Sequence, residues 1–279
     1  MSTDHIWMDV HGRINTANGL GVYYNHYLDA AGTTRETSNY PGYKAALDVM
    51  AASRRRVLVT LSFIALPAPG ISATAGQVQQ AKDTLVDQVN ALWNQHRLKL
   101  IVLAYDAAGR RPTGAHRTLD VQFRVRWVTS GGDYVMYVYP TTNDRPAVPG
   151  RTDRPAFVKA GSSRIEMHIA VDDPAWVYSH EFGHCIGIPD EYGHAGVQYI
   201  RPDGALGQIL QRLGAVIPPN KQGNVHAGVR DPDLRTGMST FANTNLMPRH
   251  LWPTAMEVRK LLNRHSTRHK FGVDVDFSR

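Results

Sequence analysis

Residues 177–192 read VYSHEFGHCIGIPDEY, and this stretch decides how the rest of the chain is interpreted. On an α-helix, His180 and His184 lie on one face, one turn apart, where two imidazoles can bind the same metal ion. Glu181 follows the first histidine and can accept a proton from a water molecule at the metal without binding the metal itself. The stretch therefore predicts a metal centre on a helix, with Glu181 as its general base.

The residues after this helix predict the third metal ligand. Gly187 can adopt the positive φ that ends a helix, and Pro189 prevents the helix from resuming. The chain then turns back and brings Asp190 towards the metal. Glu191 becomes the third ligand if the turn is shifted by one residue; otherwise we interpret it as the ion-pair partner of a nearby arginine. Two imidazoles and one carboxylate leave one position of a tetrahedral zinc ion open, as a catalytic site requires.

These residues form the pattern His-Glu-x-x-His-x-x-Gly-x-x-Asp, which resembles the motif of the zincin metallopeptidases. It is similar to the metzincin arrangement with Asp190 in place of the third histidine, as in snapalysin-type peptidases. The Asp-Glu-Tyr sequence at 190–192 also resembles bacterial metallopeptidase toxin and effector domains, including those attached to type VI secretion proteins. The resemblance is confined to residues 165–250, so it says little about the N-terminal half.

The resemblance implies an α+β fold of the zincin type: a mixed, twisted sheet with a backing helix, an active-site helix, a Met-turn and a C-terminal helix. It also implies that the strand before the active-site helix forms the sheet edge that pairs with substrate. That strand contains Ile165, Glu166, Met167 and His168. We interpret His168 as a surface or cleft-lining residue rather than a metal ligand. The Met-turn methionine is assigned to Met247, with Met238 as the alternative.

A catalytic site of this kind also needs a donor for the charge that develops on the tetrahedral oxygen. The nearest candidates along the chain are Tyr192, Arg249 and His250. The sequence does not choose among them, and each can equally orient a metal ligand.

Hydrophobic periodicity predicts the elements around this stretch. Strands are expected at 57–65, 98–105, 119–127, 134–139 and 163–171, and helices at 75–94 and 253–264. We expect the first helix to join its flanking strands as a crossover unit, and 134–139 to form a hairpin with 119–127. Residues 1–55 are interpreted as an irregular segment with one short strand and a brief helix at 43–50, packed on a catalytic domain at 56–279.

The composition is typical of a globular chain that folds without disulfides. Hydrophobic residues make up 42% of the 279 residues, and Cys185 is the single cysteine. Lysine and arginine number 31 against 24 acidic residues, a net charge of +7. We interpret this charge as a solvated basic surface and expect no nucleic-acid site, because the basic runs lack interleaved aromatic residues. The first residues lack the apolar segment of a Sec signal, and no run of about 18 apolar residues predicts a membrane span.

The sequence therefore predicts a zinc-dependent endopeptidase in which Glu181 takes a proton from the attacking water and transfers it to the leaving amine. Two alternatives are a zinc amidase acting on peptidoglycan peptides and a basic binding module in which zinc only holds the fold. The expected partner is a peptide or protein substrate. The resemblance to effector domains adds a secretion-machine carrier or an immunity protein, and export from the cytoplasm through a contractile machine to a target cell or its periplasm.

Overall fold

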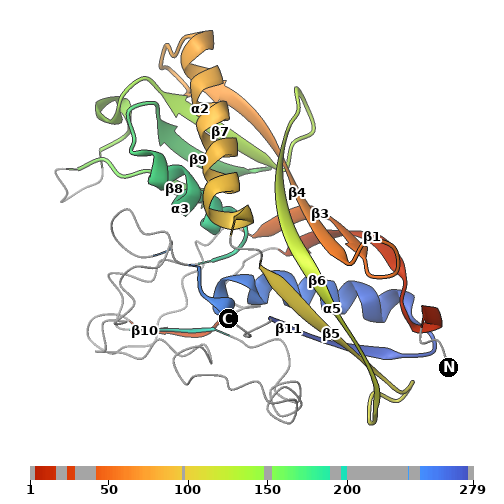
Figure 1. Cartoon of the computed structure of the whole chain (residues 1–279). Coiled ribbons are helices and arrows are strands. Elements are labelled where there is room, and N and C mark those ends of the chain that lie inside the picture. Colours follow the sequence, from red (N-terminus) through yellow and green to blue (C-terminus); the bar gives the residue numbers. More distant parts are fainter. Residues whose placement is uncertain are drawn as a thin grey trace.

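The computed structural model describes residues 4–16, 24–28, 42–95, 98–147, 153–188, 196–199, 238 and 246–275, with the backbone alone for 24–28 and 196–199. This part of the chain has a mixed α+β fold, with one nine-stranded sheet and a separate two-stranded sheet (Figure 1). None of its helices is both long enough and apolar enough to cross a membrane.

The strands are β1 (Asp9–Thr16), β2 (Tyr24–Leu28), β3 (Tyr43–Met50), β4 (Arg56–Pro67), β5 (Lys99–Tyr105), β6 (Pro112–Trp127), β7 (Tyr134–Tyr139), β8 (Phe157–Ala160), β9 (Ile165–Ala170), β10 (Gly196–Tyr199) and β11 (Lys270–Val275). The α-helices are α2 (Ala75–Gln88), α3 (Ala175–Cys185) and α5 (Trp252–His265). Shorter helical segments are η1 (Asp4–Ile6), the π-helix η2 (Val89–Asn94), η3 (Thr142–Asp144) and η5 (Pro248–Leu251).

The main sheet runs in the order β11-β5-β6-β4-β7-β9-β8. Strands β6, β4, β7 and β9 are parallel to one another, and β8 closes this end of the sheet antiparallel to β9. Strand β6 covers one edge of β4. Along the other edge of β4, strand β3 pairs with residues Arg56–Thr60 and strand β7 pairs with residues Phe63–Pro67. Strand β1 then pairs with β3, so the sheet extends into the N-terminal part of the chain.

The helices pack on one face of this sheet. The hydroxyl of Tyr43 on β3 is 3.1 Å from that of Thr254 on α5, and Tyr134 on β7 donates a hydrogen bond to α3. Trp93 of η2 packs edge-on against Phe123 of β6. Strand register places these three sheet residues on the same side, which we call the helix face. Strand side chains that alternate with them point to the opposite side, the outer face.

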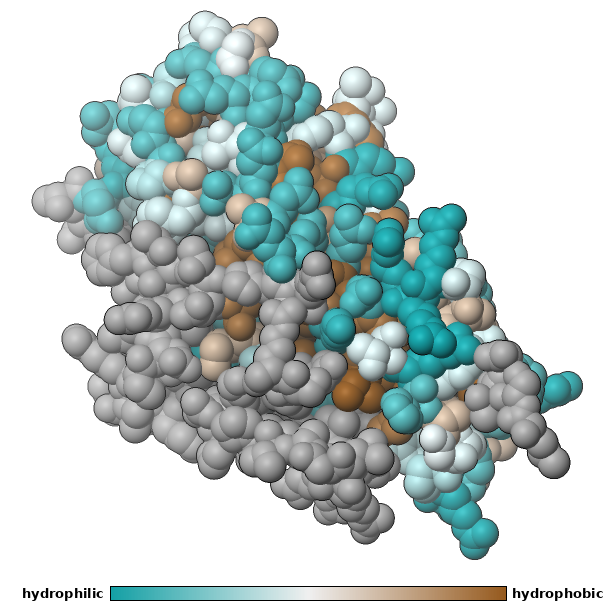
Figure 2. All heavy atoms as spheres, viewed as in Figure 1, coloured by the Kyte–Doolittle hydropathy of each residue, from teal (hydrophilic) through white to brown (hydrophobic). Residues whose placement is uncertain are grey.

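Several predicted elements are confirmed. The strands at 57–65, 98–105, 119–127 and 163–171 are β4, β5, β6 and β9, and the C-terminal helix is α5. The helix at 75–94 is present as α2 continued by η2. It begins at a capping box of Thr74 and Gln77 and buries a single stripe that contains Ala81 and Leu85. Hydrophilic side chains cover its exposed side (Figure 2).

The prediction for the N-terminal segment was wrong in one respect, because residues 43–50 form a strand and not a helix. Every second residue of β3 is fully buried, starting with Tyr43, while those between are half-buried. This is the period of a strand with one covered face. With β1, the segment thus contributes two strands to the main sheet, and the proposed boundary at residue 55 lies in the turn between β3 and β4.

Two predictions of strand partners were also wrong. Strand β7 does not form a hairpin with β6, because β4 lies between them and pairs in parallel with both. The helix α2 does not join parallel neighbours either, since β5 pairs antiparallel with β6 and is separated from β4 by that strand. Alternation identifies a strand and its buried face, but it carries no information about which strand lies beside it.

Candidate metal centre

Helix α3 carries the predicted metal ligands and is buried over most of its length. Each residue from Tyr178 to Cys185 is buried, and the helix lies against β8, β9, α2 and η2. The indole of Trp93 donates to the Ser179 carbonyl at 3.0 Å. The hydroxyl of Tyr134 donates to the Cys185 carbonyl at 2.7 Å, which satisfies a carbonyl that the end of the helix leaves without an intrahelical partner.

The turn before α3 is fixed by a buried ion pair. The guanidinium of Arg145 binds both carboxylate oxygens of Asp173 at 2.6 and 2.7 Å, and both side chains are at most 4% exposed. The same carboxylate accepts the backbone N–H of Ala170 at the end of β9. Asp172 accepts the backbone N–H of Thr142. The loop after β7 and the start of α3 are therefore held together by charge-assisted hydrogen bonds.

The structure brings His180, Glu181 and His184 together on this helix. Their candidate ligand atoms all lie within 4.8 Å of one another, and the three residues are 4–7% exposed. The two imidazole rings are perpendicular, with centroids 4.9 Å apart. In the part of the chain that the structure describes, this is the group of histidine and carboxylate side chains with the spacing to hold a metal ion.

The end of α3 determines which nitrogen of His184 can bind a metal. Gly187 has φ of 80°, as predicted for the residue that ends the helix. Its N–H bonds to the His184 carbonyl, and the N–H of Ile188 bonds to the Gly183 carbonyl, which together form a Schellman motif. The Ile188 carbonyl then lies 2.7 Å from Nδ1 of His184. Because a carbonyl only accepts, Nδ1 carries the proton and Nε2 has the lone pair.

Gly183 lies where α3 packs most tightly. A Cβ atom at this position would be 2.2 Å from Sδ of Met238 and 3.1 Å from the indole of Trp93. Met238 is fully buried. Met238, the alternative Met-turn residue, therefore packs against the histidine-bearing helix. Met247 is also buried and precedes η5.

Among the other predicted site residues, His250 has the opposite tautomer to His184. Its Nδ1 accepts the backbone N–H of Met247 at 3.1 Å, so its proton is on Nε2, which can donate a hydrogen bond. The ring is fully buried and 6.3 Å from that of Trp93. Arg249 is 1% exposed. The positions of Asp190, Glu191 and Tyr192 lie outside the described residues.

The predicted substrate edge was wrong, because β9 is an inner strand. Ile165–Ala170 pairs with β7, and Ile165–His168 pairs on its other side with β8. The backbone groups of Ile165, Glu166, Met167 and His168 are therefore used within the sheet. The strand at the end of the sheet is β8, which the sequence analysis did not predict because its four residues are too few for a periodic pattern.

His168 is not part of the metal cluster and instead belongs to a group of side chains on the outer face. Its ring stacks on Phe157 with centroids 4.2 Å apart. Nε2 donates to the carboxylate of Glu166, so Nδ1 accepts from the hydroxyl of Tyr139. Burial lowers the pKa of His168. Because His168 is 5% exposed, the expectation of a surface residue was wrong, and its ring lies on the side of the sheet opposite to α3.

Sequence reasoning missed the aromatic residues that position α3. Trp93 and Tyr134 contact α3 across 86 and 51 residues of sequence. Trp176 lies one turn before His180, and the two rings meet edge-on at 6.2 Å. The spacing of four residues between Trp176 and His180 was a signal that could have identified it as a neighbour of the first histidine.

The two imidazoles on α3 suit zinc, because histidine nitrogens are among its usual protein ligands. The orientation of His184 by a backbone carbonyl is typical of metal-binding histidines. Comparison of the chain with protein-family models, curated proteins and solved structures found no match. Its function must therefore be inferred from the side chains themselves.

Proposed function

We propose that this chain is a zinc-dependent endopeptidase of the zincin type. The observation that carries the proposal is the buried cluster of His180, Glu181 and His184, in which the Ile188 carbonyl orients one imidazole with its lone pair on Nε2. The architecture supports it: α2 backs the mixed sheet, α3 carries the cluster, Met238 packs against α3, and the C-terminal helix α5 packs on the same face of the sheet. Asp190 is our proposed third ligand, with Glu191 as the alternative.

The proposed reaction is hydrolysis of a peptide bond. Zinc bound to the histidines would polarise the substrate carbonyl and lower the pKa of a water molecule towards about 7. Glu181 accepts a proton from that water molecule while the oxygen of the water bonds to the carbonyl carbon of the substrate. When the carbon–nitrogen bond breaks, the same carboxylate gives the proton to the departing amine. The Nε2–H of His250 and the guanidinium of Arg249 are the donors that we propose for the negative oxygen.

We further propose that substrate pairs with β8. This strand ends the sheet, and within the described chain its partner is β9 on one side. It also lies against α3, so an extended peptide added to its other side would run past the helix that carries the cluster. A strand edge binds peptides through backbone hydrogen bonds and tolerates varied side chains. Cleavage of many sequences is therefore expected.

The central experiment replaces Glu181 by Gln and measures zinc content and peptide hydrolysis separately. The amide keeps the shape of the side chain but cannot accept the proton, so hydrolysis should fall by about 10²–10⁴-fold with zinc still bound. His180→Ala and His184→Ala should each lose zinc, because too few ligands remain. Full zinc retention by both histidine variants would exclude this site. Unchanged hydrolysis by Glu181→Gln would exclude the proposed base.

A second comparison identifies the third ligand. Asp190→Ala should weaken zinc binding far more than Glu191→Ala, because loss of a surface ion pair costs at most about 1 kcal/mol. The reverse order would assign the ligand to Glu191.

Substrate panels and directed expression distinguish the remaining alternatives. Cleavage of peptidoglycan peptides with no cleavage of proteins would indicate an amidase, and zinc binding with neither activity would indicate a binding module. We propose a bacterial effector role on the basis of the motif alone. Growth inhibition by the active chain and not by Glu181→Gln, with expression directed to the cytoplasm or to the periplasm, tests that role and its compartment.

A further inference from the structure

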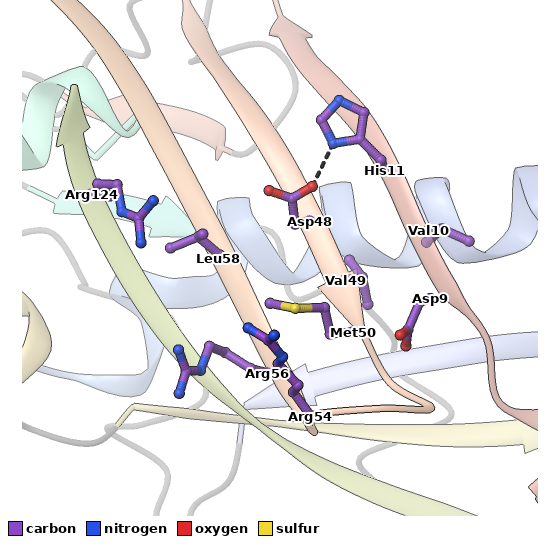
Figure 3. A pocket seen from close by; sticks show the side chains of 10 residues that line it. All are labelled: Asp9, Val10, His11, Asp48, Val49, Met50, Arg54, Arg56, Leu58 and Arg124. Carbon is purple, nitrogen blue, oxygen red and sulfur yellow. Dashed lines mark hydrogen bonds and ion pairs between the residues drawn. The ribbon is translucent and has the colours of Figure 1, made fainter. Parts of the chain in front are cut away.

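A second candidate site lies on the outer face of the sheet, away from α3. It is a pocket of about 400 Å³ where β1, β3, β4 and β6 lie side by side (Figure 3). The lining residues are Asp9, Val10, His11, Asp48, Val49, Met50, Arg54, Arg56, Leu58 and Arg124. Helix α5 is seen behind these strands, on the helix face. A ligand in this pocket therefore does not compete with one at the metal cluster.

The turn that borders the pocket is fixed from two sides. On one side, the carboxylate of Asp9 accepts the backbone N–H groups of Ala52 and Ser53 at 2.9 and 3.1 Å. On the other side, the guanidinium of Arg117 donates to the Ala51 carbonyl. Arg54 belongs to this turn, and its own backbone N–H bonds to the Met50 carbonyl. The backbone that presents Arg54 to the pocket is thus held before any ligand binds.

The acidic and basic side chains around the pocket differ in the partners that they have within the chain. Both carboxylates already have partners within the chain, since Asp9 caps the turn and Asp48 bonds to His11. No described carboxylate lies within ion-pair distance of the three arginines that line the pocket, although Arg54 interacts electrostatically with Asp9. The guanidinium of Arg56 donates to the amide oxygen of Gln122. Arg126 and Lys44 continue the same outer face, which also carries Asp120, the register partner of Arg56. The pocket therefore attracts negative charge.

The floor between the arginines is apolar and has a defined spacing. Leu58 lies on β4 between Arg56 and Thr60, and Thr60 is the register partner of Arg124. The Cα atoms of Arg56 and Arg124 are thus four residues apart along the strand direction, a distance of about 13 Å. The half-buried side chain of Leu58 lies midway between these two positions. In an extended peptide, residues i and i+4 are also about 13 Å apart. The side chains of residues i, i+2 and i+4 point to the same side of such a peptide.

We propose that this pocket docks an acidic, extended segment of a partner protein, with an apolar side chain on Leu58 and a carboxylate on each side of it. Carboxylates suit arginine because the guanidinium offers paired donors in the geometry that a carboxylate accepts. A second copy of this chain is a poor occupant, because its own net charge is +7. The site is a docking surface in addition to the proposed peptidase and does not depend on it.

The test uses a fluorescein-labelled peptide in which leucine has glutamate two residues before and two residues after it. Binding is measured by fluorescence anisotropy to the full chain, to the double variant Arg56→Glu with Arg124→Glu, and to Arg110→Glu with Arg111→Glu. The last pair is exposed on the turn between β5 and β6 and changes the net charge equally. A peptide with glutamine in place of both glutamates, inorganic phosphate and a single-stranded oligonucleotide serve as further probes.

The pocket variant should bind the acidic peptide at least about tenfold more weakly, while the turn variant binds it nearly as well as the original chain. The glutamine peptide should bind weakly to all three proteins, and added salt should weaken the specific complex. Equal loss in both charge variants would overturn the proposal, because net charge alone would explain it. Competition by the oligonucleotide or by phosphate at lower concentration than the peptide would also overturn it. Hydrolysis of a reporter peptide by the pocket variant should be unchanged.

Discussion

Gly187 connects the end of helix α3 to the chemistry of a candidate metal ligand. Its positive φ completes the Schellman motif, and that motif holds the Ile188 carbonyl against Nδ1 of His184. The carbonyl fixes the tautomer in which Nε2 has the lone pair. One backbone angle thus affects both the stability of the helix end and the readiness of the imidazole to bind zinc.

We therefore predict that Gly187→Ala lowers both stability and zinc affinity. A Cβ at positive φ should cost about 1 kcal/mol of unfolding free energy, and a displaced Ile188 carbonyl should weaken zinc binding about tenfold. Urea titration of the zinc-free protein and competition with a zinc chelator measure the two effects. Gly131→Ala is the matched control, because Gly131 has φ of 68° in an open turn with no atom within 4 Å of the added Cβ. An equal loss of zinc affinity in both variants would contradict the role of Gly187.

At this scale the sequence predicted the residues whose positions follow from local geometry. The spacing of His180, Glu181 and His184, and the helix end at Gly187, depend on helical periodicity and on allowed φ values. The packing of Met238 against Gly183 depends on a contact across 55 residues, which no local rule contains. The third ligand and Tyr192 remain predictions.

At the scale of elements, hydrophobic periodicity predicted which helices and strands are present better than it predicted which strands pair. The amphipathic helix α2 follows from a repeat of 3.6 residues and the strand β6 from a repeat of two, while β4 follows from a continuous apolar run. Strand β3 was mistaken for a helix, because six of its eight side chains are apolar and so many apolar residues satisfy both periods over so short a length. The position of β8 outside β9 had no signal, so the sequence assigned the sheet edge to the wrong strand.

The tight packing of α3 gives a prediction at the same scale. Gly183→Ala should lower the unfolding free energy by about 1–3 kcal/mol, because the new Cβ forces Met238 and Trp93 to move in a filled core. Gly76→Ala in α2 is the control, since the nearest atom to its Cβ is 3.9 Å away and alanine favours a helix. That change should leave stability unchanged or raise it.

The contact itself is tested by a double-mutant cycle with Met238→Ala. The single change leaves a cavity that should cost about 2–5 kcal/mol, and the double variant should cost less than the sum of the two singles because the alanine Cβ enters that cavity. Strict additivity in urea titrations would show that Gly183 and Met238 do not pack together. A matching cycle between Gly183→Ala and Met247→Ala should be additive.

At the scale of the whole molecule, the two faces of the main sheet carry different candidate sites. Its helix face buries the core and carries the proposed zinc site on α3, while the outer face at β1, β3, β4 and β6 presents the arginine pocket. In the part of the chain that the structure describes, the sheet lies between the two sites. Substitutions in one site should therefore leave the other unaffected, and their effects on stability should add.

The buried tyrosines of the helix face make stability sensitive to alkaline pH. Burial raises the pKa of Tyr43 and of Tyr134 above the ordinary value, with further contributions from Glu257 and Cys185 respectively. In the unfolded chain both hydroxyls ionise near pH 10. Their stabilising effect is fully present below that pH. It is lost as pH rises above it, because the unfolded state then binds fewer protons than the folded state.

We predict that the unfolding free energy starts to fall at about pH 8.5, where Cys185 ionises in the unfolded chain but has a raised pKa in the fold. Above about pH 10 it should fall more steeply, by about 1.4 kcal/mol per pH unit for each tyrosine whose pKa burial raises, including Tyr43, Tyr134 and Tyr178. Urea titrations at closely spaced pH values measure this slope. Tyr43→Phe removes one of the ionising groups at the cost of its hydrogen bond to Thr254, so it should be less stable at pH 8. Above pH 10 its slope should be smaller than that of the original chain by about 1.4 kcal/mol per pH unit. A slope equal to that of the original chain would show that Tyr43 ionises alike in both states, which is incompatible with its complete burial beneath α5.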